Sequence, residues 1–202
     1  MVDGVDVGVS GFTVDAVRGF VAQLVDEHQP NDDAEMLASS LLDASDVAGT
    51  ALLEEWRVLA ASYPRQLSAA VMRRELEIDE AWWSIDALAA RDERPALDRI
   101  LGRMQERILR VLLALNRQYL LDPKPKWLLP TLARLEVKPS GIETVWRSLP
   151  HSAGTDQVAM MQDLFEATLD LVAAHRVGVD INVVRRWYRH RRPAWRTDRT
   201  GL

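Results

Sequence analysis

Residues 95–115 of the chain read PALDRILGRMQERILRVLLAL. Apolar side chains recur along this stretch at alternating steps of four and three residues, which places them on one face of an α helix. Pro95 suits the first turn of a helix, where its missing N–H is not needed. The apolar positions are Leu97, Leu101, Met104, Ile108, Val111 and Leu115. The pattern predicts the central helix of a helical bundle.

Similar patterns on both sides of this stretch predict further helices. Thr13 and Thr155 are suited to cap two of them, because a threonine hydroxyl accepts from an early helix N–H. Pro64 interrupts a third, since proline removes a backbone donor. The expected helices cover about 13–28, 33–42, 50 onward with a break at Tyr63–Pro64, 79–91, 131–135, 155–175 and 180–190. We therefore expect an all-α fold, an antiparallel helical bundle of six to eight helices.

The N-terminus departs from the helical pattern. Residues 2–9 read VDGVDVGV and alternate valine with smaller or polar residues, which predicts one short strand. A single strand leaves its backbone groups unpaired, so we expect pairing through residues 2–9 with a protein partner or a second copy of the chain. The expected organisation is a remnant strand with linking helices over 1–48, then a helical bundle domain with a basic tail over 49–202.

Composition excludes several kinds of chemistry. The chain has 202 residues and no cysteine, which rules out disulfides, cysteine-held metals and thiol nucleophiles. Its four histidines form no known ligand spacing, so no metal site is expected. No basic leader and no apolar run of membrane-spanning length is present, and we expect a soluble, cytoplasmic protein without a membrane partner.

Charge is distributed unevenly along the chain. Residues 1–60 contain twelve acidic residues against two arginines, whereas residues 185–202 contain seven arginines against one aspartate. The candidate basic patch consists of Arg185, Arg186, Arg189 and His190. It has the composition to bind phosphate, RNA or an acidic protein, but such runs are more often solvated or docked on the acidic part of their own chain. Nucleic acid is therefore not the favoured partner.

Two further patterns carry weak chemical signals. Arg185 and His190 show the Arg-x4-His spacing that resembles the nuclease motif of HEPN-domain RNases, which are small helical bundles; surface charge at the end of a helix is the favoured interpretation. Paired acids such as Glu75 and Glu77 are expected on solvated helix faces rather than at a catalytic base.

Residues 115–127 carry a more unusual pattern. LNRQYL at 115–120, followed by PKPKW at 123–127, resembles the L-N-R-x-Y…P-x-K-W signature of the helical C-terminal domain of bacterial nucleotidyltransferase-like proteins, which are similar to aminoglycoside nucleotidyltransferases. Tyr63–Pro64 and the tryptophan-containing stretch near 78–90 also fit, so the resemblance covers roughly 50–190. It implies a substrate- or partner-binding role for Asn116, Arg117, Tyr119, Lys124, Lys126 and Trp127. For Asn116 and Arg117 a structural role is the favoured alternative, because buried polar groups are usually satisfied locally.

The catalytic part of that family has no counterpart in this chain. In the family an α/β core with a Gly-Ser loop and an Asp-x-Asp pair holds two magnesium ions and a nucleoside triphosphate. Here only residues 2–17 resemble the end of such a core, and either Gly8 or Asp6 falls near the position of its third acid, with Gly8 in the preferred register. We therefore expect no catalytic residues and no cofactor, unless another chain supplies the core with Mg and a nucleoside triphosphate. The leading expectation is a non-catalytic substrate- or partner-binding module; the alternatives are a HEPN-like RNase, or a subunit or fragment of an active nucleotidyltransferase.

Overall fold

A computed structural model describes residues 11–45, 49–122, 127–175 and 178–192. All regular secondary structure in these residues is helical, as expected. The strand expected at residues 2–9, and the pairing proposed through it, lie outside the described residues. The α helices are α1 (Val14–Val25), α2 (Asp32–Asp43), α3 (Thr50–Ala61), α4 (Arg65–Glu75), α5 (Ile85–Ala90), α6 (Arg94–Leu115), α7 (Leu128–Arg134), α8 (Ile142–Ser148), α9 (Gly154–His175) and α10 (Ile181–Arg189), with short 3-10 helices η1 (Glu80–Ser84) and η2 (Leu149–His151).

The expected central helix is present as α6, which packs against α4, α5 and α9. Its predicted apolar stripe is buried from Leu97 to Val111, while Leu115 is half-buried. The stripe predicted on α9 is buried along its whole length, from Val158 to Val172. These two 22-residue helices contribute more buried residues to the core than any other helix that the structure describes.

Several local signals act as predicted at helix ends. The Thr13 side chain accepts from the Ala16 N–H and caps α1. Pro64 separates α3 from α4. Thr155, expected as a cap, lies inside α9, which begins one residue earlier at Gly154. A Cβ at Gly154 would lie 3.0 Å from the Leu97 side chain, so the start of α9 packs closely on α6 at a position that suits glycine.

The described residues contain ten α helices rather than six to eight, because short segments form helices of their own. The helix α8 was not predicted from the sequence, although Ile142 and Trp146 are both buried and lie four residues apart on one face. Seven residues are too few to display the repeating pattern that identified α6.

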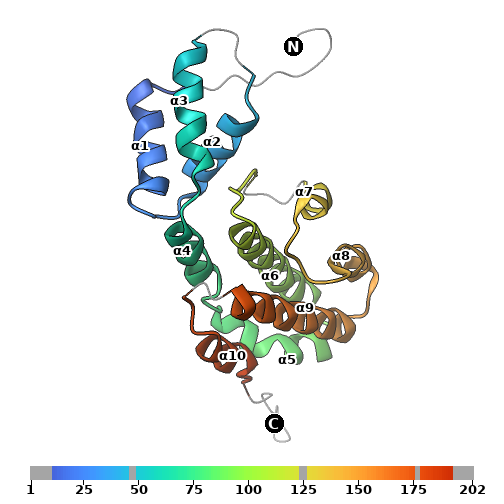
Figure 1. The fold of residues 1–202 in the computed structure, drawn as a ribbon. Coiled ribbons are helices and arrows are strands. Elements are labelled where there is room, and N and C mark those ends of the chain that lie inside the picture. Colours follow the sequence, from blue (N-terminus) through green and yellow to red (C-terminus); the bar gives the residue numbers. More distant parts are fainter. Residues whose placement is uncertain (1–10, 46–48, 123–126, 176–177, 193–202) are drawn as a thin grey trace, which may run out of the picture.

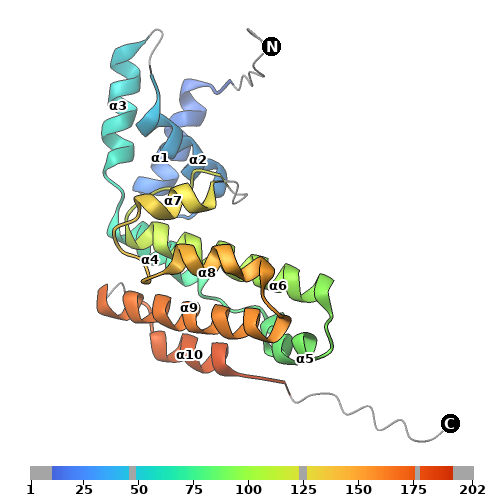
Figure 2. The same cartoon turned by 90° about the vertical axis from the view of Figure 1, so that its right-hand side faces the viewer.

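The helices form two groups (Figure 1). In both views α1, α2 and α3 lie together at one end of the molecule, and α4 to α10 make up the rest (Figures 1 and 2). Within the first group, Val17, Val21 and Leu41 form a small apolar cluster of their own. Since α3 packs against α1 and α2, the N-terminal group extends past residue 48; the predicted domain boundary at 48/49 stays a prediction.

Candidate functional site

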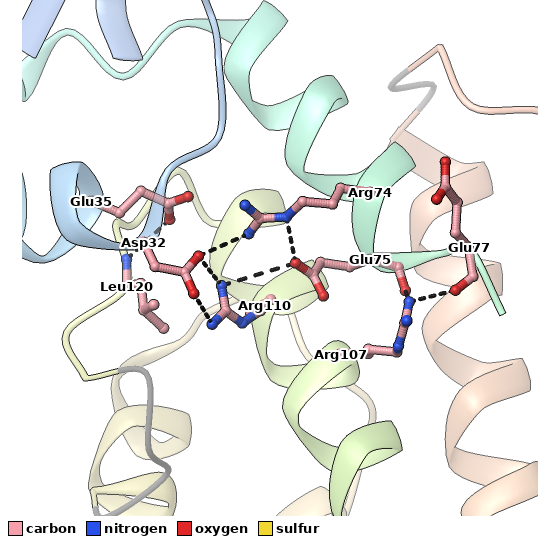
Figure 3. A network of polar contacts seen from close by, with 8 residues as sticks. All are labelled: Asp32, Glu35, Arg74, Glu75, Glu77, Arg107, Arg110 and Leu120. Carbon is pink, nitrogen blue, oxygen red and sulfur yellow. Dashed lines mark hydrogen bonds and ion pairs between the residues drawn. The ribbon is translucent and has the colours of Figure 1, made fainter. Parts of the chain in front are cut away.

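A polar network joins the N-terminal group to the rest of the molecule (Figure 3). The Arg110 guanidinium on α6 donates to both carboxylate oxygens of Asp32 on α2, each at 2.7 Å. Arg74 on α4 donates to Asp32 at 3.3 Å and to Glu75 at 2.8 Å. We call Asp32, Arg74, Glu75 and Arg110 the Asp32 network. It connects three helices through ion pairs.

The electrostatics of the Asp32 network favour its charged form. The hydrogen bond from Arg110 lowers the pKa of the Asp32 carboxyl below its ordinary value of 3.8. Burial opposes the charge on Arg110, but the bond to Asp32 and the nearby charges of Glu75, Asp32 and Glu35 together outweigh it and raise the pKa of the guanidinium. Glu75, expected on a solvated face, instead has a side chain only 11% exposed. That expectation was wrong because α6 brings Arg110 to within 3.9 Å of its carboxylate.

A second carboxylate of α2, Glu35, lies deeper behind this network. One of its oxygens accepts from the Leu120 N–H at 3.3 Å, while the other has no hydrogen-bond partner. Burial raises the pKa of Glu35, although the nearby charge of Arg74 works in the opposite direction. Asp32 and Glu35 therefore respond to the fold with pKa shifts of opposite sign.

Arg107 of α6 contacts the backbone at and just after the C-terminal end of α4. Its guanidinium donates to the carbonyl oxygens of Glu75 at 2.9 Å and Glu77 at 2.5 Å. In Figure 3 the Glu77 carboxylate points away from this contact and from the Asp32 network. A polar cleft of about 440 Å³ lies beside these residues. Arg74, Arg107 and Arg110 already have hydrogen-bond partners in the protein. We therefore interpret the cleft as a contact that holds the helices together and not as a ligand site.

An apolar groove of about 550 Å³ lies where the end of α4 and η1 face α10. Trp187 of α10 lines it and is 55% exposed. Small-molecule sites are commonly apolar hollows of about 300–1,000 Å³ with a few polar groups at the edge. We call this hollow the Trp187 groove; its apolar residues are Leu76, Ile78, Trp83, Val179, Val183, Val184 and Trp187, and its charged residues are Arg73, Glu77, Glu80 and Asp180.

Ring stacking fixes the position of Trp187. Its indole stacks on that of Trp83 with centroids 5.4 Å apart, and the Trp83 Nε1–H donates to the Trp187 carbonyl at 3.2 Å. The adjacent pair repeats the arrangement, since Trp82 stacks on Tyr188 at 5.2 Å and donates to the Tyr188 carbonyl at 3.1 Å. These two ring stacks, each with an indole hydrogen bond, fix the position of α10 on one side of the groove. They join residues more than a hundred positions apart in the sequence.

Asn116 and Tyr119, two of the residues singled out by the LNRxY resemblance, make contacts inside the structure. The Asn116 side chain donates to the carbonyls of Leu112 and Val137 and accepts from the N–H groups of Glu136 and Val137. It therefore ties the end of α6 to the chain after α7, a structural role.

The tyrosine of the same motif is also internal. Tyr119 is buried, donates to the Ala60 carbonyl at 2.9 Å and packs on Tyr63 with ring centroids 4.7 Å apart. Burial raises its pKa to about 12. The structure thus brings together Tyr63 and Tyr119, two residues of the resemblance.

Of the remaining candidates of this motif, Arg117 and Trp127 lie in the described residues, and they line different hollows. Arg117 is exposed and has a positive φ of 51° at the turn that follows α6. Trp127 is 59% exposed at the start of α7. Lys124 and Lys126 lie outside the described residues.

The candidate basic patch is partly neutralised within the chain. Arg185 pairs with Glu166 at 3.0 Å and with Asp170, and Arg189 pairs with Glu166 at 2.7 Å. Arg186 makes no ion pair with any residue that the structure describes, and the His190 ring packs edge-on against Trp83 at 4.6 Å. A hollow of about 530 Å³ is lined by Trp83, Arg186, Trp187 and His190.

These arginines dock on acids of α9, and not on the N-terminal acids that the sequence suggested as their partners. The N-terminal acid Asp32 is instead held by Arg74 and Arg110, arginines from the middle of the chain. The physical reason is the chain path: α9 runs beside α10, whereas α2 lies at the other end of the molecule (Figures 1 and 2).

Comparison with protein-family models, curated protein sequences and solved structures finds no significant match to this chain. Within the described residues no group of three or more histidine, cysteine, aspartate or glutamate side chains is arranged to hold a metal ion. No helix in the same residues combines the length and apolar character needed to cross a membrane.

Sequence reasoning did not identify the Trp187 groove or the Asp32 network. The sequence does show that Val183 and Trp187 are apolar and four residues apart, hence on one face of a helix, but only the structure shows that both are exposed. For the Asp32 network no sequence signal existed, because Asp32 is 42 residues from Arg74 and 78 residues from Arg110 in the chain.

Proposed function

We propose that this chain is a non-catalytic helical module, related to the C-terminal domain of nucleotidyltransferase-like proteins, that binds a substrate or partner in the Trp187 groove. The observation that carries the proposal is the exposed indole of Trp187 over an apolar groove of about 550 Å³. An exposed indole held rigidly by stacking on Trp83 loses little conformational freedom when a ligand covers it.

The relation to that family rests on the LNRQY motif. Asn116 and Tyr119 tie the end of α6 to residues 136–137 and to the end of α3. Because Asn116 and Tyr119 make structural contacts, they support a domain architecture shared with that family better than a shared reaction. In this proposal the helices form the antiparallel bundle expected for the domain, with α6 at its centre.

Two exposed tryptophans allow a direct test of where a ligand binds. Trp187 lies in the groove and is 55% exposed, while Trp127 lies beside the LNRxY motif and is 59% exposed. Trp127→Ala is therefore the control for Trp187→Ala, because it removes an exposed tryptophan that does not line the Trp187 groove. Thermal unfolding would be measured with Mg-ATP, Mg-GTP and aminoglycoside-type acceptors, because a ligand of the folded state raises the midpoint.

We expect the ligand-induced rise to survive in Trp127→Ala and to disappear in Trp187→Ala. The opposite pattern would transfer the binding site to the LNRxY region. If no ligand raises the midpoint of the parent protein, substrate binding is refuted for these ligand classes, and a protein partner remains the occupant to test.

A HEPN-like RNase is the first alternative, and the geometry gives it less support. Arg185 is engaged by Glu166 and Asp170, and His190 packs against Trp83, so each residue already has a structural contact. RNA cleavage by the parent protein that disappears in His190→Ala would establish this alternative. Absence of cleavage, or unchanged cleavage in the variant, would remove it.

The second alternative is a subunit or fragment of an active nucleotidyltransferase, completed by a partner at residues 2–9. It requires nucleotide labelling of a substrate when a catalytic core is added to the purified chain. A homodimer through the same residues predicts a dimeric mass by light scattering. A monomeric mass would contradict the homodimer.

A further inference from the structure

The apolar part of the Trp187 groove suits a flat or compact organic body. Two indole rings, Trp83 and Trp187, form one wall, and aliphatic side chains such as Leu76 and Val184 form the floor. Both aliphatic residues are buried, with exposed fractions of 3% and 8%, so the floor is already packed against the core. The groove is therefore pre-formed, and a ligand would add apolar contacts without reorganising it.

The charged part of the groove is richer in carboxylates than in cations. Glu77, Glu80 and Asp180 line it, against the guanidinium of Arg73. Arg192 neutralises Glu80 through a bond of 2.5 Å. The Glu77 carboxylate points away from the Asp32 network (Figure 3) and makes no ion pair with the described residues. Glu77 and Asp180 together still outweigh Arg73, which favours a positively charged ligand.

The aromatic wall favours the same sign of charge. The face of an indole ring attracts a cation within about 6 Å, and organic ammonium ions are recognised by tryptophan in this way. The protein already uses the attraction nearby, since the Arg192 guanidinium lies 5.5 Å from the Trp83 ring centroid. We propose that the Trp187 groove binds an organic cation with an apolar body, with its charge toward Glu77 and its body against Trp187. This inference rests on the proposed function and names its ligand class.

Three probes with one ring system separate charge from shape. These are 2-naphthylmethylammonium, the neutral 2-naphthalenemethanol and the anionic 2-naphthoate, titrated into the full chain. The indole N–H resonance of Trp187, assigned as the one lost in Trp187→Phe, reports binding at this groove. We expect the ammonium to bind about tenfold more tightly than the alcohol, a ratio expected for one cation–π contact with a partly exposed ion pair. The naphthoate should bind most weakly.

The variant Glu77→Gln tests the charge contribution, because it removes the carboxylate and keeps the backbone carbonyl that Arg107 holds. The matched control is Glu55→Gln, which removes an exposed carboxylate on α3, outside the groove. We expect the preference for the ammonium to fall severalfold in Glu77→Gln and to stay unchanged in Glu55→Gln.

The outcomes separate the inference from the function on which it rests. If the three probes perturb Trp187 with equal affinity, or the preference is the same in Glu77→Gln as in the parent, the groove binds ligands but the ligand class is wrong. Tighter binding of the naphthoate would show that Arg73 dominates and would also overturn the inference. If no probe perturbs Trp187, this inference is refuted, while the thermal-unfolding comparison of Trp187→Ala with Trp127→Ala decides the proposed function separately.

Discussion

Replacing Asp32 by asparagine should weaken the attachment of the N-terminal helices to the rest of the molecule. Asp32 accepts two bonds of 2.7 Å from Arg110 and one of 3.3 Å from Arg74. The Arg110 side chain is only 14% exposed, so water replaces the lost carboxylate poorly. Asparagine has nearly the same shape as aspartate, and the substitution therefore removes charge without leaving a cavity.

The size of the effect follows from the exposure of both partners. Hydrogen bonds that involve charged groups contribute about 1.5–3 kcal/mol when they are formed in a protein. Because the Asp32 side chain is 39% exposed, solvent screens part of the interaction and we expect about 2 kcal/mol. For a chain of this size that corresponds to a fall in Tm of about 4 to 8 °C.

A neighbouring residue provides the control. Asp33 also lies in the first turn of α2 but is exposed. Both substitutions lose a favourable interaction with the helix dipole of about 0.3–1 kcal/mol. Thermal unfolding followed by circular dichroism should show a larger fall for Asp32→Asn than for Asp33→Asn. Equal falls would mean that the bonds to Arg110 and Arg74 contribute nothing measurable, and the reasoning would be refuted.

The same comparison has a predictable dependence on pH. Because Arg110 lowers the pKa of folded Asp32 below 3.8, the unfolded chain takes up a proton first as the pH falls. The stabilising contribution of the Asp32 carboxylate is fully present above the pKa of this group in the unfolded chain. It is lost as the pH falls through the lower pKa of the group in the folded chain. The difference in Tm between the parent and Asp32→Asn should therefore shrink below about pH 3.8.

Two further substitutions test the polar contacts of the core. Glu35→Gln keeps an acceptor for the Leu120 N–H and removes a charge that burial disfavours. Because the pKa of folded Glu35 is raised above 4.5, the parent protein loses stability as the pH rises from 4.5. The variant should therefore have the higher Tm at pH 7, and the difference in Tm should vanish below pH 4.5. A lower Tm for the variant at pH 7 would contradict this. Asn116→Ala leaves the N–H groups of Glu136 and Val137 without their acceptor, and we expect a loss of about 2 kcal/mol in urea unfolding with an unchanged m-value. A loss of less than about 0.5 kcal/mol would indicate that water replaces the amide.

The elements that were predicted correctly have signals contained within one segment. The stripe of α6 repeats over 22 residues, so it identifies both the helix and its buried face. The Thr13 cap and the break at Pro64 depend on two or three neighbouring residues. The short α8 could not be predicted in this way, because Ile142 and Trp146 provide only one step of the apolar pattern.

The candidate site could not be predicted in the same way. The charge of Glu75 was visible in the sequence, but its burial depends on Arg110, which is 35 residues away in the chain and reaches it from another helix. Trp83 and Trp187 are 104 residues apart, and only the packing of α10 on η1 makes them one wall of a groove. The sequence singled out Asn116 and Tyr119 as binding candidates, whereas their hydrogen-bond partners lie in distant segments that only the fold brings close.

The sequence by itself determined the helical class, the main breaks and the buried faces of the long helices, because the 3.6-residue period and the capping and proline rules act along the chain. The tertiary structure decided which charges are neutralised and which aromatic rings stay exposed. Arg185 and Arg189 are satisfied by Glu166 of the adjacent α9, and Asp32 by Arg110. Ion pairs and ring stacks depend on distances of a few ångströms in space, and those distances exist only after the helices have packed.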